Sequence, residues 1–262
     1  MGFLTDLVRR IRADLAAHPL DAGALEPAAA AARPARDLAG ALRTDRTLSV
    51  IAEVKHASPS VGAIAADADP VERATAYAAG GAAAISVLTE PVHFGGSLDD
   101  LRAVTAVVGT PVLRKDFLVT EPQVLQARAA GADSILLITS CLSDDELEKL
   151  LGRARALGME PLVETHDDAD LGRALASDAR IVGVNARNLE TLEVDVDAAL
   201  ARLRLIPPDR IAVLESGVTG PEHAAAAAAA GASAILVGET LMRAGDPAAA
   251  IRQLRAVVPE RG

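Results

Sequence analysis

Short apolar segments alternate along most of the chain with longer segments whose apolar residues recur every three or four positions. The short segments have the length and the Val, Ile, Leu and Ala content of buried strands, and the longer ones have the period of amphipathic helices. The predicted strands are Ser49–Val54, Ala83–Val87, Pro111–Leu113, Ser134–Ile138, Glu160–Val163, Ile181–Val184, Ile211–Leu214 and Ala234–Val237. Helices are predicted near residues 71–79, 98–107, 121–130, 143–157, 167–176, 196–205, 219–230 and 246–257.

This alternation is typical of repeated βα units and a parallel sheet. Eight such units match the α/β fold class and a closed (β/α)8 TIM barrel. A doubly wound open sheet is the alternative, but it normally carries a glycine-rich loop after its first strand. The first strand here runs into Glu53-Val-Lys55-His-Ala-Ser58-Pro-Ser60, which is not such a loop. We therefore expect a barrel. Left-handed helix ends are expected at Gly80, Gly131, Gly158 and Gly231, each just before a strand.

Residues 1–47 precede the first predicted strand and have a helical, Ala-rich pattern. Phe3, Leu4, Leu7, Ile11 and Leu15 recur at the spacing of one helix face. The segment is too short to hold a core of its own. We interpret residues 1–262 as a single domain, with a short helical N-terminal extension (1–47) followed by the barrel (48–262).

Composition and charge exclude several classes of function. The formal net charge is -10 and no long Lys/Arg block occurs, so nucleic acid is not an expected partner. No stretch approaches the roughly 20 apolar residues of a membrane span, and the charged first twenty residues do not have the pattern of a signal peptide. We expect no membrane partner and a cytoplasmic location.

The cysteine and histidines indicate no metal centre. Cys141 is the only cysteine, and its apolar neighbours favour a packed side chain rather than a nucleophile. The five histidines lack the spacing of metal ligands, so we expect no metal.

Ionisable and hydrogen-bonding side chains stand where the predicted strands end. They are Glu53, Lys55, Arg114, Lys115, Asp116, Glu164, Asn185, Arg187, Glu215, Ser216 and Glu239. Because the carboxyl ends of all barrel strands face one side, these groups are expected to converge there. Closely spaced lysines and carboxylates have shifted pKa values that suit proton transfer. The pattern predicts an acid–base site on this rim.

The last two strand ends predict a phosphate site. Ser216-Gly217 and Val237-Gly238-Glu239 each place a glycine where the backbone can approach a ligand closely. Loops at these two positions commonly bind phosphate through backbone N–H groups in this fold. Glu239 would contribute its amide while its carboxylate turns away. We therefore expect a small phosphorylated substrate.

Together these strand ends resemble the indole-3-glycerol phosphate synthase family. The matching segments are Ile51-Ala-Glu-Val-Lys-His-Ala-Ser-Pro-Ser60, Val87-Leu-Thr-Glu90, Phe94-Gly-Gly-Ser97, Leu113-Arg-Lys-Asp-Phe117, Leu162-Val-Glu164, Gly183-Val-Asn-Ala-Arg-Asn-Leu189, Glu215-Ser-Gly217 and Leu236-Val-Gly-Glu239. The resemblance covers essentially the whole chain. It implies a carboxy-lyase of tryptophan or indole biosynthesis that converts 1-(2-carboxyphenylamino)-1-deoxyribulose 5-phosphate to indole-3-glycerol phosphate, losing CO₂ and water without metal or organic cofactor.

The resemblance also implies residue roles. Lys115 would protonate the ketone oxygen during ring closure, and Lys55, tuned by Glu53, would hold the substrate carboxylate. Glu164 is the candidate base for dehydration, and the division of acid and base roles among these four residues stays open. Asn185 and Glu215 would orient the sugar hydroxyls and the lysines. Substrate contacts are implied for Ser58, Phe94, Arg187, Ser216, Gly217, Gly238 and Glu239.

Three features depart from the family pattern. His56 replaces a usual Arg, Val61 replaces a frequent Lys, and Thr139-Ser-Cys141 is more polar than expected. One alternative is a barrel lyase or isomerase that acts on another sugar phosphate, such as a Schiff-base aldolase using Lys115 or Lys55. Another is a catalytically silent barrel that binds a phosphate metabolite or a partner enzyme, although binding alone would not require so many acids and bases. We expect a monomer or weak oligomer and leave a pathway-enzyme partner and the pathway itself open.

Overall fold

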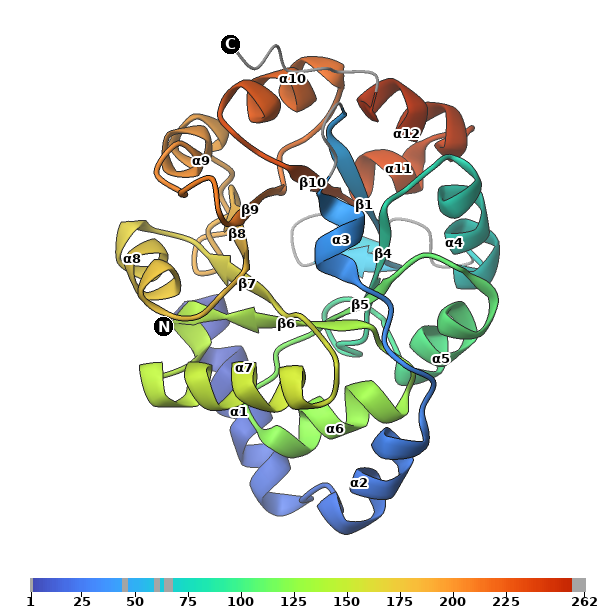
Figure 1. Ribbon diagram of the computed structural model, residues 1–262, viewed down its shortest axis with the longest axis vertical. Coiled ribbons are helices and arrows are strands. Elements are labelled where there is room, and N and C mark those ends of the chain that lie inside the picture. Colours follow the sequence, from blue (N-terminus) through green and yellow to red (C-terminus); the bar gives the residue numbers. More distant parts are fainter. Residues whose placement is uncertain (1, 44–46, 59–61, 64–67, 256–262) are drawn as a thin grey trace.

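Eight parallel strands close into a barrel in the computed structural model, which describes residues 2–43, 47–58, 62–63 and 68–255 (Figure 1). The strands are β1 (Ser49–Val54), β4 (Ala84–Leu88), β5 (Val112–Lys115), β6 (Ser134–Ile138), β7 (Leu162–Thr165), β8 (Ile181–Asn185), β9 (Ile211–Glu215) and β10 (Ala234–Val237). Each pairs with the next in the chain, and β10 closes the barrel by pairing with β1. The TIM-barrel prediction is confirmed.

The strands are apolar because both of their faces are covered. Nearly every strand residue is buried, and the side chains form one core with the surrounding helices. Five strands (β4, β5, β7, β8 and β9) end later than predicted, and Lys115, Asn185 and Glu215 are themselves the last residues of β5, β8 and β9. The antiparallel pair β2 (Ala57–Ser58) and β3 (Gly62–Ala63) follows β1 and lies outside the barrel sheet.

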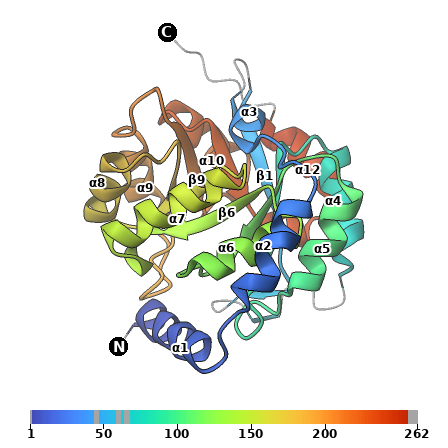
Figure 2. The ribbon, with the colours of Figure 1, turned by 60° about the horizontal axis from the view of Figure 1, so that its bottom comes forward.

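The outer layer consists of helices that alternate with the strands (Figures 1 and 2). They are α4 (Pro70–Ala79), α5 (Leu98–Val107), α6 (Glu121–Ala129), α7 (Asp144–Ala156), α8 (Asp168–Ala176), α9 (Val196–Leu203), α10 (Pro221–Ala229) and α12 (Pro247–Arg255). The 3-10 turn η1 (Thr139–Cys141) and the short α11 (Glu239–Arg243) were not predicted, because such short elements show no hydrophobic period.

Three of the four predicted left-handed glycines are confirmed. Gly131, Gly158 and Gly231 have φ of 91°, 79° and 96°. The prediction for Gly80 is wrong, since its φ is −71° and the following Gly81 has φ of 88°. Gly80 serves a different purpose: a β-carbon there would lie 2.7 Å from the Cα of Ala248 in α12, so glycine permits close helix packing.

The N-terminal extension forms three helices, at the two ends and on the flank of the barrel. They are α1 (Phe3–Ala17), α2 (Ala22–Ala31) and α3 (Leu38–Leu42). In α1, Leu4 and Leu7 are buried against the barrel, as the helical period predicts. The α3 helix lies at the end where β1 begins, and the hydroxyl of Ser49 donates to the Leu42 carbonyl at 3.3 Å. Figure 2 shows α2 on the flank beside α6, whereas α1 lies at the end of the barrel opposite α3.

A buried carboxylate fastens this extension to the barrel. Asp133, fully buried before β6, accepts hydrogen bonds from both terminal nitrogens of Arg33 at 2.6 and 3.0 Å. It also accepts from the backbone N–H groups of Arg36 and Val112, at 2.8 and 2.9 Å. One side chain thus joins the extension to the starts of β5 and β6.

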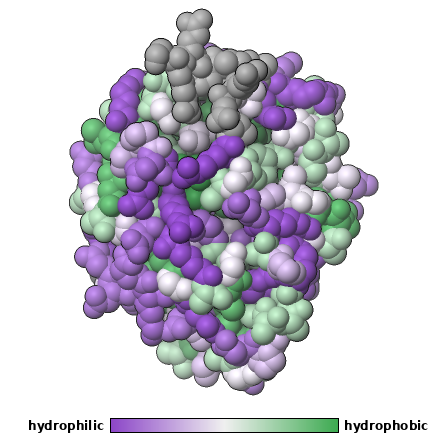
Figure 3. All heavy atoms as spheres, viewed as in Figure 1, coloured by the Kyte–Doolittle hydropathy of each residue, from purple (hydrophilic) through white to green (hydrophobic). Residues whose placement is uncertain are grey.

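Polar residues predominate on the face seen in Figure 3, and apolar residues lie among them in separate groups. Among the described residues, no helix has both the length and the apolar character needed to cross a membrane.

Candidate active site

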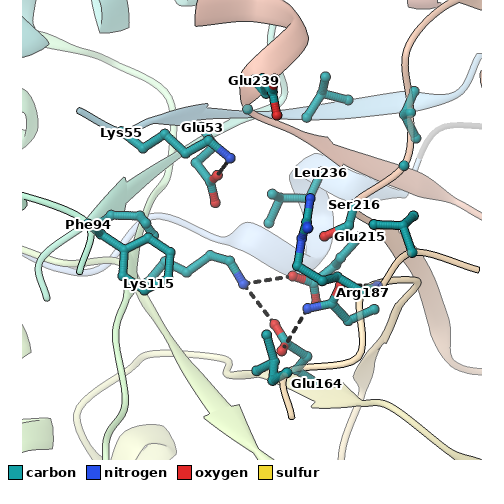
Figure 4. A pocket seen from close by; sticks show the side chains of 18 of the residues that line it. Glu53, Lys55, Phe94, Lys115, Glu164, Arg187, Glu215, Ser216, Leu236 and Glu239 are labelled. Atoms are coloured by element: carbon teal, nitrogen blue, oxygen red, sulfur yellow. Dashed lines mark hydrogen bonds and ion pairs between the residues drawn. The ribbon is translucent and has the colours of Figure 1, made fainter. Parts of the chain in front are cut away.

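A pocket of about 570 Å³ opens where the barrel strands end. Of the strand-end groups and substrate contacts predicted for the site, all except Arg114 and Ser58 line it, and Figure 4 shows most of them around the opening. The Arg114 guanidinium is buried and donates to Thr89, the Gln123 carbonyl and Asp116 instead. Ser58 belongs to β2, but its side chain lies outside the described residues. The barrel topology therefore brings together residues that lie far apart in sequence.

Lys115 is the centre of the charge arrangement in this pocket. Its Nζ donates to Glu164 Oε2 at 2.7 Å and to Glu215 Oε2 at 2.9 Å (Figure 4). Burial of the ammonium acts to lower its pKa, but the charges of Glu164, Glu215 and Glu53 outweigh burial and raise the pKa above its usual value. Lys115 therefore carries a proton at neutral pH.

Glu164 is held on both of its oxygens. Lys115 occupies Oε2, and the side-chain amide of Asn185 donates to Oε1 at 3.0 Å. Burial alone would raise the pKa of this carboxyl, but the positive charges of Lys115 and His166 hold it well below its usual range. Glu164 is consequently ionised, as a proton acceptor must be.

Glu215 differs from Glu164 although both contact the same ammonium. Burial and the neighbouring charge of Glu164 raise the pKa of Glu215 to about 8. The room for its side chain comes from Gly183 on β8, where a β-carbon would lie 2.2 Å from Glu215 Oε1. The two carboxyls thus have opposite protonation states near neutral pH.

A second lysine–carboxylate pair comes from β1 and the residue just after it. Lys55 Nζ lies 3.1 Å from Glu53 Oε1, and only 15% of the Lys55 side chain is exposed. Figure 4 shows this pair on a different wall of the pocket from the Lys115 cluster. The space between the two pairs is therefore bordered by two ammonium groups.

Positive φ angles mark the loop after β9, where the sequence predicts part of a phosphate site. Ser216 and Gly217 have φ of 64° and 74°, and a positive φ is uncommon for serine. The Thr240 hydroxyl donates to the Val218 carbonyl at 2.8 Å, which ties the two loops together. The Glu239 carboxylate accepts from Arg243 in its own helix at 3.0 Å, so it is engaged by a cation.

Aromatic side chains form an apolar wall of the pocket. The rings of Phe94 and Phe117 lie 6.2 Å apart and are tilted by 37°. Glu90 supports the Phe94 loop, because its Oε2 accepts from the Phe94 N–H at 3.3 Å while Oε1 accepts from Arg10 of α1 at 3.0 Å. Phe3 of α1 also lines the pocket, so the N-terminal extension contributes directly to it.

Arg187 is held at the pocket by the backbone around it. Its N–H donates to Asn185 Oδ1 at 3.0 Å, and its guanidinium donates to the Leu192 carbonyl at 3.0 Å. An antiparallel bridge pairs it with Val194. Its place in Figure 4, beside Ser216 and Glu215, suits contact with an anionic group.

Several lining residues were not found from the sequence. The apolar ones include Phe3, Leu88, Leu136, Ile138, Leu189, Leu192 and Leu236. Apolar residues at these places look like ordinary core residues, and Phe3 lines the site only because α1 docks beside it. No signal in the sequence distinguishes them.

Two of the three departures from the family pattern lie near the site rather than in its charged centre. His56 Nε2 is 3.3 Å from Asp100 Oδ2 at the start of α5. Val61 lies outside the described residues. Thr139 supports Glu164, since its hydroxyl donates to the Glu164 carbonyl at 3.0 Å, and Cys141 is buried as predicted. Within residues 2–43, 47–58, 62–63 and 68–255, no group of three His, Cys, Asp or Glu side chains is arranged to hold a metal.

Solved structures with a similar fold include a 3-hexulose-6-phosphate synthase, with a TM-score of 0.65, 23% identity and coverage of 81% of this chain and 100% of that one. A thiamine phosphate pyrophosphorylase from Pyrococcus furiosus has a TM-score of 0.60 and 15% identity, covering 83% of this chain and 96% of that one. At these identities the likeness concerns the barrel fold.

Similarity in sequence is much closer to another group of proteins. An indole-3-glycerol phosphate synthase of a Nocardioides species is 51% identical, covering 98% of this chain and 99% of the relative. Indole-3-glycerol phosphate synthase 1 of Streptomyces coelicolor and the enzyme of Rhodococcus opacus are each 50% identical, over 97% of this chain and 95% of each relative. The model of the family described as indole-3-glycerol phosphate synthase matches residues 4–254. The chain belongs to the indole-3-glycerol phosphate synthase family.

Proposed function

We propose that this protein converts 1-(2-carboxyphenylamino)-1-deoxyribulose 5-phosphate to indole-3-glycerol phosphate, CO₂ and water by acid–base chemistry, as a carboxy-lyase that needs no metal or organic cofactor. The arrangement that carries this proposal is the pair of lysine–carboxylate groups on two walls of one pocket. Family membership supports the choice of substrate.

Ring closure is assigned to Lys115. The aromatic carbon that bears the carboxylate attacks the ketone carbon, and a proton moves from the ammonium to the ketone oxygen, which becomes a hydroxyl. The hydrogen bonds to Glu164 and Glu215 favour the protonated form of Lys115, which supplies this proton. When the ketone oxygen takes the place of one carboxylate, burial disfavours the charged lysine and promotes transfer.

Decarboxylation follows from the product of ring closure. The bond from the ring carbon to the carboxylate breaks, CO₂ leaves, and the electron pair restores the aromatic ring. Lys55, with Glu53 at 3.1 Å, holds the carboxylate before this step. Arg187 and Phe94 contact the anthranilate part, and Ser58 is assigned to the same part from the family resemblance.

Dehydration needs an acid and a base. The hydroxyl takes a proton from Lys55 and leaves as water, while Glu164 removes a proton from the neighbouring carbon of the new ring. The low pKa of Glu164 keeps it ready to accept this proton. Asn185 fixes its orientation through the 3.0 Å hydrogen bond.

The phosphate is assigned to the loops after β9 and β10. Backbone N–H groups around Ser216, Gly217, Gly238 and Glu239 supply the donors, which is the usual arrangement in this fold. The positive φ of Ser216 and Gly217 supports this assignment, because strained backbone concentrates at ligand sites.

A Schiff-base lyase is the rival enzyme. It would need a neutral lysine as nucleophile, whereas the contacts of Lys115 with Glu164 and Glu215 keep its ammonium charged. Borohydride treatment with substrate distinguishes the two, since only an imine would be trapped as a stable adduct.

The experiment is an indole fluorescence assay with purified protein and the anilino-ribulose phosphate. The chain has no Trp and one Tyr, so its own fluorescence is low. We expect product with and without a metal chelator. The variant Lys115→Met should lose activity, whereas Lys149→Met, at a lysine 69% exposed, should not. Absence of indole at high enzyme concentration would refute the proposed function.

A further inference from the structure

His166 contacts Glu164 Oε1, whereas Lys115 binds the other carboxylate oxygen, Oε2. Its Nε2 lies 3.0 Å from Glu164 Oε1, and its Nδ1 lies 3.6 Å from Asp170 Oδ2. Only 9% of the His166 side chain is exposed. The imidazole therefore lies buried within ion-pair distance of one carboxylate of the pocket and of a second carboxylate outside it.

The local sequence builds this link. His166 follows Glu164 by two positions at the end of β7, so both side chains start from the same side of the strand. Asp170 lies in the first turn of α8, where Asp167 caps the helix by accepting from the Asp170 N–H at 2.8 Å. Asp170 in turn accepts from the His166 backbone N–H at 3.4 Å.

The groups around His166 favour its charged form. Glu164 and Asp170 flank the ring, and Ser140 Oγ lies 3.5 Å from His166 Nδ1. Beyond Asp170, the nearest cation is Arg173, whose guanidinium lies 3.8 Å from Asp170 Oδ1. Burial acts to lower the pKa of His166, but the contacts with Asp170 and Glu164 outweigh burial and raise it to about 9.

A second cavity of about 280 Å³ adjoins the far side of the ring. Its polar lining includes His166, Ser140, Asp167, Asp170, Asn188 and Glu190, and α1 contributes Leu4, Thr5 and Val8. Asp167 and Glu190 also line this cavity, and their negative charges add to those of Glu164 and Asp170 in favouring a cationic imidazole.

The consequence for the pocket concerns two carboxyls. Glu164 is placed between Lys115 and His166, whereas Glu215 contacts Lys115 alone of these two cations. Because two buried carboxylates that share one ammonium repel each other, the better compensated one keeps the charge and its neighbour keeps a proton.

We propose that His166, held by Asp170, is a positioning residue that keeps Glu164 ionised and oriented as the base and leaves the proton of the carboxyl pair on Glu215. The inference deepens the proposed function, on which its account of Glu164 rests.

The first test needs no substrate. The imidazole nitrogens of the ligand-free, ¹⁵N-labelled protein are observed by NMR from pH 6 to 10, and His166 is assigned by the loss of its signals in His166→Gln. We expect both nitrogens to be protonated at pH 7.5. Titration near pH 6.5, the value for an exposed histidine, would overturn the proposal.

The second test is the pH dependence of turnover. His166→Gln keeps an N–H group near Glu164 but removes the positive charge. The pKa of Glu164 should therefore rise, and the acidic limb of the pH–rate profile should shift to higher pH by about one unit. We expect the turnover rate to fall by about tenfold at the acidic end of the profile and by less at pH 8.5. Asp170→Asn should shift the limb in the same direction, and His18→Gln, at an exposed histidine, should not shift it.

The outcomes separate the two proposals. An equal loss of rate at every pH, with no movement of the limb, would mean that His166 is only structural. Wild-type protein that makes no indole at any pH would refute the proposed function, and the NMR titration then decides the charge of His166 by itself.

Discussion

The carboxylate of Glu53 occupies the space that a side chain at Gly238 would need. A β-carbon on Gly238 would lie 2.4 Å from Glu53 Oε1 and 3.0 Å from both Cε and Nζ of Lys55. The missing side chain at the end of β10 thus makes room for the charged pair of β1. The sequence suggested only a phosphate role for Gly238, and the structure adds this second reason for glycine.

We predict that Gly238→Ala folds but loses activity. The atoms that clash are the ends of two long side chains, which can move away without disturbing the barrel. Displacement of a catalytic group by about 1 Å can cost roughly a hundredfold in rate. Melting curves should stay close to wild type while indole formation falls. Gly109→Ala, where a β-carbon meets nothing within 4 Å, is the matched control, and an equal loss there would contradict the prediction.

Glu164→Gln should lower kcat by about 10² to 10⁴, the usual contribution of a general base. The amide keeps the size of the side chain and an oxygen for Lys115, so KM should change little. Steady-state kinetics of indole formation measure both constants. Glu148→Gln, at an exposed residue of α7, is the control. A variant that raises KM and leaves kcat unchanged would show that Glu164 only binds substrate.

Glu215 should make stability depend on pH. Its pKa rises from 4.5 to about 8 on folding, so the folded protein keeps a proton that the unfolded chain releases. Stability from this group is fully present below pH 4.5 and is lost as pH rises through 8. Glu215→Gln cannot ionise, so its advantage in Tm over wild type should grow between pH 5 and pH 9. A difference that is constant with pH would contradict this account.

Asp133→Ala should be strongly destabilising. The substitution leaves the Arg33 guanidinium and two backbone N–H groups without their buried acceptor. Breaking such a buried pair costs about 3 to 5 kcal/mol. Asp168→Ala, which removes an 82% exposed partner of Arg202, should cost less than about 1 kcal/mol. Denaturant titration of both variants tests the difference, and similar values would refute it.

The charged centre of the site was predictable because barrel geometry gathers strand ends. Lys115, Glu164 and Glu215 lie on three different strands, yet all end on one rim. The strand register that lets one ammonium contact both carboxylates is set by side-chain packing around the barrel, which a single sequence does not display. The second role of Gly238 could not be predicted for the same reason, because its neighbour in space, Glu53, lies far away in the sequence.

His166 is a different case, because a signal was present. Its position two residues after Glu164 places it beside that residue at the strand end. The spacing of His166 from other histidines carries no metal-site pattern, but its spacing from Glu164 indicates a contact between the two side chains. For Phe3 no comparable signal exists, since its place depends on how α1 docks.

The Arg33–Asp133 contact also bears on the time course of synthesis. The two residues are 100 positions apart, so the extension emerges from the ribosome long before its acceptor. At about 5 to 20 residues per second, that interval is roughly 5 to 20 seconds. During it, Leu4 and Leu7 lack the barrel surface that later buries them. The apolar face of the first helix therefore has no barrel surface to pack against until the middle of the barrel has been translated.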